Sequence, residues 1–428
     1  MVTTAFVKLW GKTVGAVVWS EEQQLASFEY DVAFDLPEHP VAPIRMPRKS
    51  IYTFPELRGS PTFKGLPGLL ADALPDRYGN QLINVWLAQN GRPQNSLNPV
   101  ELLCFIGKRG MGALEFEPVI SPNKPQSYTL ELSSLIDTTR ELLSRKEDFR
   151  LNTSQRMQDV MLDVLKMGTS AGGARPKAII AYNEATGEIR SGQTLAERGF
   201  EHWLIKFDGV SDAQFGSSDG YGRVEMAYYK MATDFGIQMM ESRLIEEKGR
   251  AHFMTKRFDR KEGNRKVHVQ TWCAMQHYDF NEIRSFGYEQ LFQTMRLLRL
   301  NYAEAEQMYR RMVFNVLSRN CDDHTKNFAF MMDTDGKWRL APAYDLCHAY
   351  RPGSDWVSQH CLSIQGKRIG FRKQDLLAIA KQNSIRTPEQ VLEEGLEIIS
   401  KWEQYASEFE VENSLQKAIG ESLVTKLE

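Results

Sequence analysis

The most informative stretch of the chain is Arg319–Asn327, which reads Arg-Asn-Cys-Asp-Asp-His-Thr-Lys-Asn. Asp322 and Asn327 are five positions apart in it. In a protein-kinase catalytic loop, this spacing separates the Asp that accepts the substrate hydroxyl proton from the Asn that holds magnesium. Asp345, in Ala343–Leu346, follows where a kinase places its second magnesium-binding Asp. The spacing therefore favours phosphoryl transfer.

Two other interpretations of these residues remain open. Asp and Asn are common in loops, so Asp322 and Asp323 could simply turn the chain. The Cys321-x-x-His324 pair, with the Cys-His pair at 347–348, could instead bind zinc. One C-x-x-H and an adjacent Cys-His pair are poor zinc spacing, which disfavours the metal-site alternative.

The composition bounds the class of protein. With 428 residues the chain can form two or three domains and bury a core without disulfides. Its formal net charge of −2 gives no general electrostatic attraction to the phosphate backbone of DNA, so direct nucleic-acid binding is not expected. The five cysteines contain no C-x-x-C pair, which favours reduced thiols in a cytoplasmic protein. No stretch approaches the ~18 apolar residues of a transmembrane helix, and Lys8 and Lys12 interrupt any secretory apolar segment.

The hydrophobic pattern changes from strand-like to helix-like along the chain. Short strands and turns are expected in residues 1–60, and a second sheet-like block is expected at 178–258. From Tyr288 onward the pattern is mostly helical, apart from a small hairpin at 328–340. This order predicts a sheet-rich lobe, a helical lobe and a cleft between them.

Kinase chemistry also needs a lysine that neutralises phosphate charge and a glutamate that orients it. Lys206 lies in the apolar strand Leu204–Phe207, where a charge is either an edge residue or functional. Glu225 follows in the next predicted helix, although helices expose many Glu side chains.

The run Gly168–Lys177 reads Gly-Thr-Ser-Ala-Gly-Gly-Ala-Arg-Pro-Lys and is a candidate phosphate-covering loop. Small residues let the backbone approach phosphates, and successive N–H groups can bind an anion. A flexible linker has the same composition. The run also matches G-x-S-x-G, but that hydrolase motif needs a strand before it and a helix after it, the reverse of what is expected here.

The segment Lys256–Arg260, at the end of the sheet-like block, is the best-placed connector to offer backbone to an adenine ring. A basic strand end would look the same. The wider run Lys256–Lys266 is interleaved with Asp259 and Glu262, so we expect it to be a solvated face.

Together these residues resemble the HipA family of serine/threonine kinases, the toxin half of bacterial HipA–HipB toxin–antitoxin modules. The resemblance covers most of the chain, and its strongest stretches are Gly68–Tyr78, Leu102–Leu114, Ser170–Lys177, Leu204–Asp208, Lys256–Arg260, Asn320–Phe328 and Ala341–Leu346. It implies an α+β, two-lobed, protein-kinase-like fold with an extra N-terminal subdomain. The implied domains are an N-terminal subdomain at 1–125, a sheet-rich nucleotide-binding lobe at 126–260 and a helical catalytic lobe at 261–428.

The resemblance also implies roles for single residues. Asp322 would be the catalytic base, and Asn327 and Asp345 would hold Mg²⁺. The implied ATP-binding set, contacting phosphates or offering backbone to adenine, is Lys206, Lys256, Phe258, Gly172, Gly173 and Lys177.

A regulatory site is implied as well. Ser170 would be autophosphorylated, which would expel the loop and switch the kinase off, although the adjacent Thr169 leaves the modified hydroxyl open. A phosphate would add roughly two negative charges and compete with the phosphates of ATP.

The resemblance further implies partners. A small helix-turn-helix antitoxin of HipB type would carry the DNA contact, and the protein substrate would be a translation component such as an aminoacyl-tRNA synthetase. The chain departs from the general kinase pattern in lacking H-R-D, and Tyr344-Asp345-Leu346 stands in place of D-F-G. A kinase-shaped corepressor that needs no catalysis and a small-molecule kinase are the alternatives.

Overall fold

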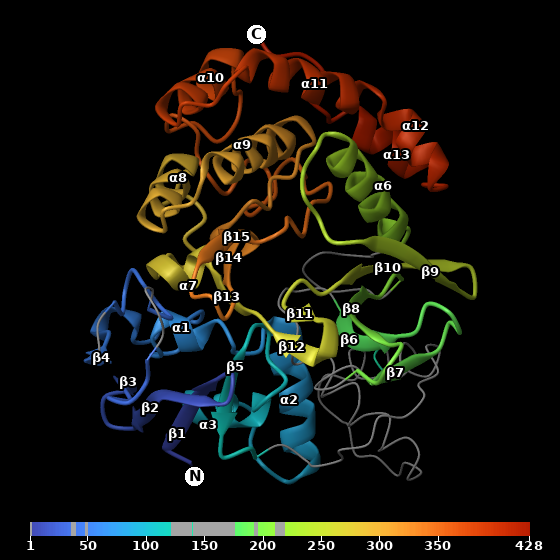
Figure 1. The fold of residues 1–428 in the computed structure, drawn as a ribbon. Helices are drawn as coiled ribbons and strands as arrows, with labels where there is room; N and C mark the ends of the chain where they lie inside the picture. Colours follow the sequence, from blue (N-terminus) through green and yellow to red (C-terminus); the bar gives the residue numbers. More distant parts are fainter. Residues whose placement is uncertain are drawn as a thin grey trace. The chain divides into compact units, whose positions relative to one another are not determined.

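The computed structural model describes residues 2–35, 40–47, 50–120, 139, 176–191, 196–209 and 219–428. They pack into two compact units. The described parts of 1–36, 48–219 and 243–269 form the sheet-rich unit, and those of 37–47, 220–242 and 270–428 form the helical unit. Figure 1 shows their elements coloured along the chain. The predicted α+β class, with one sheet-rich and one mostly helical part, is confirmed.

The sheet-rich unit begins with an antiparallel sheet in the order β4-β3-β2-β1-β5. Its strands are β1 (Thr4–Leu9), β2 (Lys12–Ser20), β3 (Leu25–Tyr30), β4 (Ile51–Thr53) and β5 (Leu114–Glu117). Trp10 and Gly11 join β1 to β2 with φ angles of 49° and 78°. Two successive positive φ angles make a turn whose twist matches that of the paired strands.

Three helices and a 3-10 turn separate β4 from β5. They are η1 (Pro55–Leu57), α1 (Gly68–Ala71), α2 (Arg77–Gln89) and α3 (Pro99–Ile106). The sequence starts α3 with a capping box, in which the Asn98 side chain accepts from the Glu101 N–H and the Glu101 carboxylate accepts from the Asn98 N–H. Pro99 stands first in the helix, where its missing N–H costs nothing. Every residue of α3 is buried.

A second sheet follows in the order β7-β6-β8-β10-β9. The elements of this part are β6 (Lys177–Tyr182), β7 (Ile189–Ser191), β8 (Glu201–Lys206), β9 (Ser242–Glu247), β10 (Arg250–Lys256), β11 (Arg260–Lys261), η2 (Glu262–Asn264) and β12 (Arg265–Lys266). One apolar cluster joins α2 and α3 to this sheet, and its members are Tyr78, Leu82, Ile83, Leu87, Leu97, Leu102, Phe105, Ala178, Ile180, Ile189, Trp203, Ile205, Phe207 and Met254. The N-terminal helices therefore share their core with the second sheet.

The expectation that Lys256–Lys266 is a solvated face is wrong for its first half, although Lys261, Glu262, Gly263 and Arg265 are exposed. Arg257, Asp259 and Arg260 are all buried. The Asp259 carboxylate accepts from Arg257 Nε at 2.8 Å and from Arg260 at 2.6 Å. It also accepts from the Gly112 N–H at 2.7 Å, and Arg260 donates to the Gly110 carbonyl at 2.9 Å. The carboxylate and the glycine turn accept hydrogen bonds from both cations, which offsets part of the cost of burying them.

The helical unit contains α6 (Tyr221–Asp234), α7 (Trp272–Gln276), α8 (Tyr288–Leu297), α9 (Tyr302–Leu317), η3 (Thr325–Asn327), α10 (Lys373–Gln382), α11 (Pro388–Ser400), α12 (Trp402–Glu408) and α13 (Asn413–Gly420). A capping box of Asn301 and Glu304 starts α9, which leads directly to the Asp322 loop. The chain passes from one unit to the other in β13 (His268–Thr271), which forms a three-stranded sheet with β14 (Ala329–Met332) and β15 (Trp338–Leu340). The predicted hairpin at 328–340 is confirmed by the pairing of β14 with β15.

The predicted domain boundaries stay predictions. The segment around 125/126 lies outside the described residues. The second predicted boundary, at 260/261, lies within the sheet-rich unit, which continues to 269. Helix α6 packs against α11 and α12 and so belongs to the helical unit. No described helix is both long and apolar enough to cross a membrane.

Candidate active site

The Asp322 loop is anchored at its start by backbone pairing. After α9 the chain turns at Arg319, whose φ is 56°, and Asn320 then forms a parallel bridge with Ala349. The Cys321 N–H donates to the Ala349 carbonyl at 3.0 Å, and the Ala349 N–H donates to the Arg319 carbonyl at 3.1 Å. The backbone on both sides of Asn320, two residues before Asp322, is therefore bonded to Ala349.

The five-residue spacing closes the loop. The Asn327 side-chain Nδ2 donates to the backbone carbonyl of Asp322 at 2.7 Å. Because the amide nitrogen is committed to this bond, its oxygen is directed elsewhere and keeps its capacity as an acceptor or metal ligand. The structure therefore brings Asp322 and Asn327 together.

Asp345 belongs to the same region of the helical unit. Its φ is 53°, a left-handed conformation that Asp adopts more readily than most residues. Its backbone carbonyl accepts from Asn320 Nδ2 at 3.4 Å. Burial raises the pKa of the Asp322 carboxyl above its ordinary value, and the negative charge of Asp345 adds to the rise. Because 33% of the Asp322 side chain is exposed, water screens part of this effect.

Asp323, next in sequence, has a different environment. Its buried carboxylate accepts from Tyr288 Oη at 2.9 Å, from His360 Nδ1 at 3.0 Å and from the Cys361 N–H at 2.8 Å. Burial by itself lowers the pKa of the His360 imidazole, but the Asp323 carboxylate outweighs burial and raises it to about 10. Asp323 and His360 therefore form a buried ion pair that holds the loop from within.

The same network continues through amides toward Asp345. Asn315 Nδ2 donates to Tyr288 Oη at 3.0 Å, and Asn320 Nδ2 donates to Asn315 Oδ1 at 2.9 Å. Asn320 is also the residue whose side chain reaches the Asp345 carbonyl. One chain of hydrogen bonds thus links the backbone at Asp345 to the carboxylate beside Asp322, and such networks favour a single arrangement.

Sequence reasoning missed Trp356. Its indole Nε1 donates to Asp322 Oδ1 at 2.5 Å, across 34 residues of chain. The rings of Phe280 and His324 lie beside it, each with its centroid 6.1 Å from that of Trp356. No local motif marks such a long-range contact, and the only available signal was a tryptophan in a loop rich in turn residues.

The sheet-rich unit carries the predicted phosphate-binding lysines. Lys206 is the last residue of β8, beside Lys177 on β6 and Phe253 on β10. Its Nζ lies 5.8 Å from the centroid of the Phe253 ring. The Lys177 side chain is only 3% exposed and pairs with Asp76 at 3.5 Å. Lys177 would have to leave this pair to reach a phosphate.

The predicted adenine connector lies after β10. The ammonium group of Lys256 pairs with Glu201, which leaves its backbone as the part that could meet a base. Phe258 follows, between the two buried arginines of the Asp259 cluster. Glu225 is buried in α6, within the helical unit.

The predicted loop residues Ser170, Thr169, Gly172 and Gly173 lie outside the described residues. The described part of the chain holds no group of three or more His, Cys, Asp or Glu placed to bind a metal, so the zinc alternative gains no support. The predicted magnesium site includes the amide of Asn327, and asparagine is not among those four residue types.

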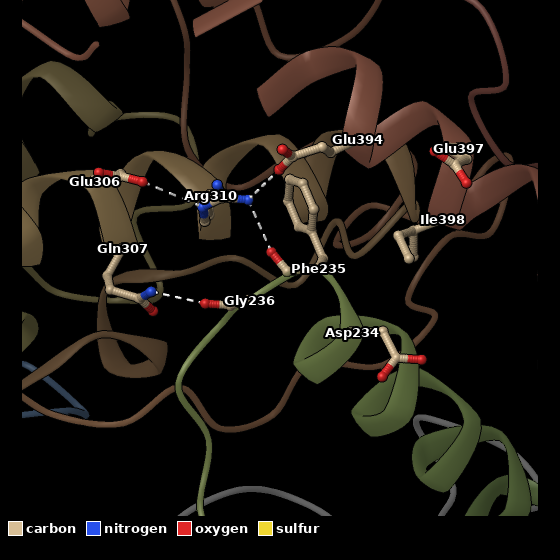
Figure 2. A pocket seen from close by; sticks show the side chains of 9 residues that line it. All are labelled: Asp234, Phe235, Gly236, Glu306, Gln307, Arg310, Glu394, Glu397 and Ile398. Carbon is tan, nitrogen blue, oxygen red and sulfur yellow. Dashed lines mark hydrogen bonds and ion pairs between the residues drawn. The ribbon is translucent and has the colours of Figure 1, made fainter. Parts of the chain in front are cut away.

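The helical unit also holds a cavity of about 550 Å³, drawn in Figure 2. It is lined by Asp234, Phe235, Gly236, Glu306, Gln307, Arg310, Glu394, Glu397 and Ile398. Arg310 donates to the Phe235 carbonyl at 3.0 Å and to Glu394 at 2.8 Å, and Gln307 donates to the Gly236 carbonyl at 2.8 Å. These bonds tie the end of α6 to α9 and α11. The cavity contains none of the predicted site residues.

Comparisons with known proteins identify the family of the chain. Residues 5–117 match the family model of the HipA N-terminal domain, and residues 169–419 match that of the HipA-like C-terminal domain. The chain belongs to the HipA family. No curated protein sequence matches it significantly.

Two solved structures are similar to this HipA-family chain. It is similar to a chain of the toxin–antitoxin complex of HipA, HipB and operator DNA from Shewanella oneidensis MR-1, with a TM-score of 0.68, 16% identity, and coverage of 97% of this chain and 94% of that one. A weaker likeness links it to the proinflammatory kinase CtkA of Helicobacter pylori, with a TM-score of 0.34, 13% identity, and coverage of 59% and 90%. The first likeness shows that the HipA fold extends over nearly the whole chain.

Proposed function

We propose that this protein is an ATP- and magnesium-dependent protein serine/threonine kinase. The grouping of Asp322, Asn327 and Asp345 in one region of the helical unit carries the proposal. Membership of the HipA family supports it.

Asp322 is proposed as the general base. Its side chain is partly exposed, so an acceptor hydroxyl can reach it. The burial that raises its pKa also makes the carboxylate a better proton acceptor than an exposed one. As the hydroxyl oxygen bonds to the terminal phosphorus of ATP and ADP leaves, the hydroxyl proton would pass to Asp322.

Asn327 and Asp345 are proposed to hold magnesium. An amide oxygen and a carboxylate are hard oxygen ligands, the type that Mg²⁺ prefers. When bound, the ion would neutralise phosphate charge during transfer. The negative charge of Asp345 raises the pKa of Asp322, which means that the two carboxylates repel each other. A bound magnesium ion would reduce this repulsion.

The sheet-rich unit is proposed to bind the rest of ATP. Lys206 is the proposed phosphate contact, and the backbones of Lys256 and Phe258 are proposed for adenine. Gly172 and Gly173 would cover the phosphates. Phosphorylation of Ser170 would then place a competing negative charge there and switch the kinase off.

We further propose that the kinase is a growth-arresting toxin held by a helix-turn-helix antitoxin of HipB type. The fold shared with the HipA, HipB and operator DNA complex supports this partner. The net charge of −2 is consistent with DNA contact made through the antitoxin. The proposed substrate is a translation component such as an aminoacyl-tRNA synthetase.

The test is phosphate transfer from Mg-[γ-³²P]ATP to the protein itself and to lysate proteins, with phosphosites mapped by mass spectrometry. The wild type should label itself, at Ser170 or Thr169, and Asp322→Asn should lose on the order of 10²- to 10⁴-fold in rate. Asp355→Asn, an exposed acid in a nearby loop, is the matched control and should retain the rate. Equal labelling by wild type and Asp322→Asn, or none by wild type, would refute the proposal.

A further inference from the structure

Asp322 has a side-chain partner that neither its motif nor its loop provides. Trp356 Nε1 donates to Asp322 Oδ1 at 2.5 Å. His324 Nε2 lies 3.8 Å from the same oxygen. Both groups therefore lie on the Oδ1 side of the carboxylate.

Trp356 is itself held in place. The Ser354 hydroxyl oxygen accepts from the N–H of Trp356 and from that of Val357, both at 3.2 Å. The Trp356 ring packs edge-on against Phe280 and His324, which lie 5.2 Å from each other. A donor fixed by a turn and by two rings can impose its direction on the group that accepts from it.

We propose that Trp356 is a positioning residue for Asp322, an inference that rests on the proposed kinase function. The terminal torsion of an Asp side chain is broad, so a partly exposed carboxylate would otherwise rotate. With Oδ1 held by the indole, Oδ2 is the oxygen that faces the acceptor hydroxyl. Trp356 thus selects which oxygen takes the proton and keeps it in the reactive direction.

Phe280, His324 and Trp356 also form an aromatic cluster beside Asp322. All three side chains are partly exposed. Lys326 Nζ lies 4.8 Å from the centroid of the Phe280 ring, and this ring also packs against Trp356. The acceptor hydroxyl would therefore approach a carboxylate bordered by rings.

The test compares Trp356→Phe with Trp402→Phe. The first removes the indole N–H that reaches Asp322. The control removes an indole N–H that donates to the Gln416 carbonyl at 2.9 Å in the same unit. Trp356→Phe should lower the self-phosphorylation rate on the order of 10- to 100-fold, since small misplacement of a reacting group has this cost. Affinity for a fluorescent Mg-ATP analogue should stay within about twofold, because the proposed role of Trp356 is to orient Asp322, which acts on the acceptor hydroxyl and not on the nucleotide.

Trp356→Gln, whose amide N–H can donate at similar reach, should recover part of the rate lost in Trp356→Phe. Trp402→Phe should keep the wild-type rate even if it melts earlier. An unchanged rate in Trp356→Phe, or equal losses in Trp356→Phe and Trp402→Phe, overturns the inference. If Trp356→Phe does not fold, replacing Trp356 with the sulfur isostere benzothienylalanine removes only the N–H, and an unchanged rate overturns the inference in the same way. Asp322→Asn keeps the two questions separate, since its full activity would defeat the kinase proposal and not the positioning role alone.

Discussion

Replacing Asp323 with Asn should destabilise the helical unit strongly. The carboxylate is buried and accepts three hydrogen bonds of 3.0 Å or less, from Tyr288, His360 and the Cys361 N–H. An amide would keep one acceptor oxygen and turn its NH₂ toward donors. It would also leave the charged His360 without its counter-ion. Removing one partner of a buried ion pair typically costs about 3–5 kcal/mol.

This cost should be visible in thermal unfolding followed by circular dichroism. For a unit of this size each kcal/mol lowers Tm by roughly 2–4 °C, so Asp323→Asn should melt about 6–20 °C below wild type at pH 7. Asp355→Asn removes an exposed acid and should change stability by no more than about 0.5 kcal/mol. A Tm for Asp323→Asn equal to that of Asp355→Asn would refute the reasoning.

The pH dependence gives an independent check. The pKa of His360 rises from its ordinary 6.5 to about 10 in the folded protein, so the folded state holds the proton more tightly than the unfolded state. The stabilisation is therefore complete below pH 6.5 and is lost as the pH rises through 10. The gap in Tm between wild type and Asp323→Asn should shrink over this range. A gap that stays constant or widens would show that the ion pair is not its source.

Three further changes test other parts of the structure. Asp259→Ala removes the acceptor shared by Arg257 and Arg260 and should lower the free energy of unfolding by about 3–5 kcal/mol in urea, whereas Glu262→Ala in the exposed η2 turn should change it little. Lys206→Met should slow phosphate transfer on the order of 10²-fold, with the exposed Lys12→Met as its control, and an unchanged rate would remove Lys206 from the ATP site. Asp345→Ala should abolish magnesium-dependent labelling and growth arrest on expression while antitoxin binding persists, and growth arrest that survives this change would favour the corepressor alternative.

The local features were predictable because they depend on neighbours in sequence. The Asn327 side chain donates to the carbonyl of Asp322, five residues earlier, so the spacing of the two residues is enough to predict a closed loop. The strands and turns of residues 1–60 and the hairpin at 328–340 follow from turn residues between apolar runs.

Charge patterning was a poorer guide where distant segments meet. The run after β10 looked solvated because it mixes acids and bases. In the fold, Asp259 instead bonds a glycine 147 residues away, and the buried arginines pack around it. Lys177 looked like a loop lysine, but Asp76 meets it in the interior.

The amino-acid order alone determined the α+β class, the Asp322–Asn327 loop and the family. Only tertiary packing decided that Asp323 is structural while Asp322 is accessible, because two adjacent side chains differ through partners, His360 and Trp356, that lie more than 30 residues away. Such long-range contacts produce no periodic pattern or fixed spacing in the sequence, because the segment between the two partners can vary in length and path without changing their contact.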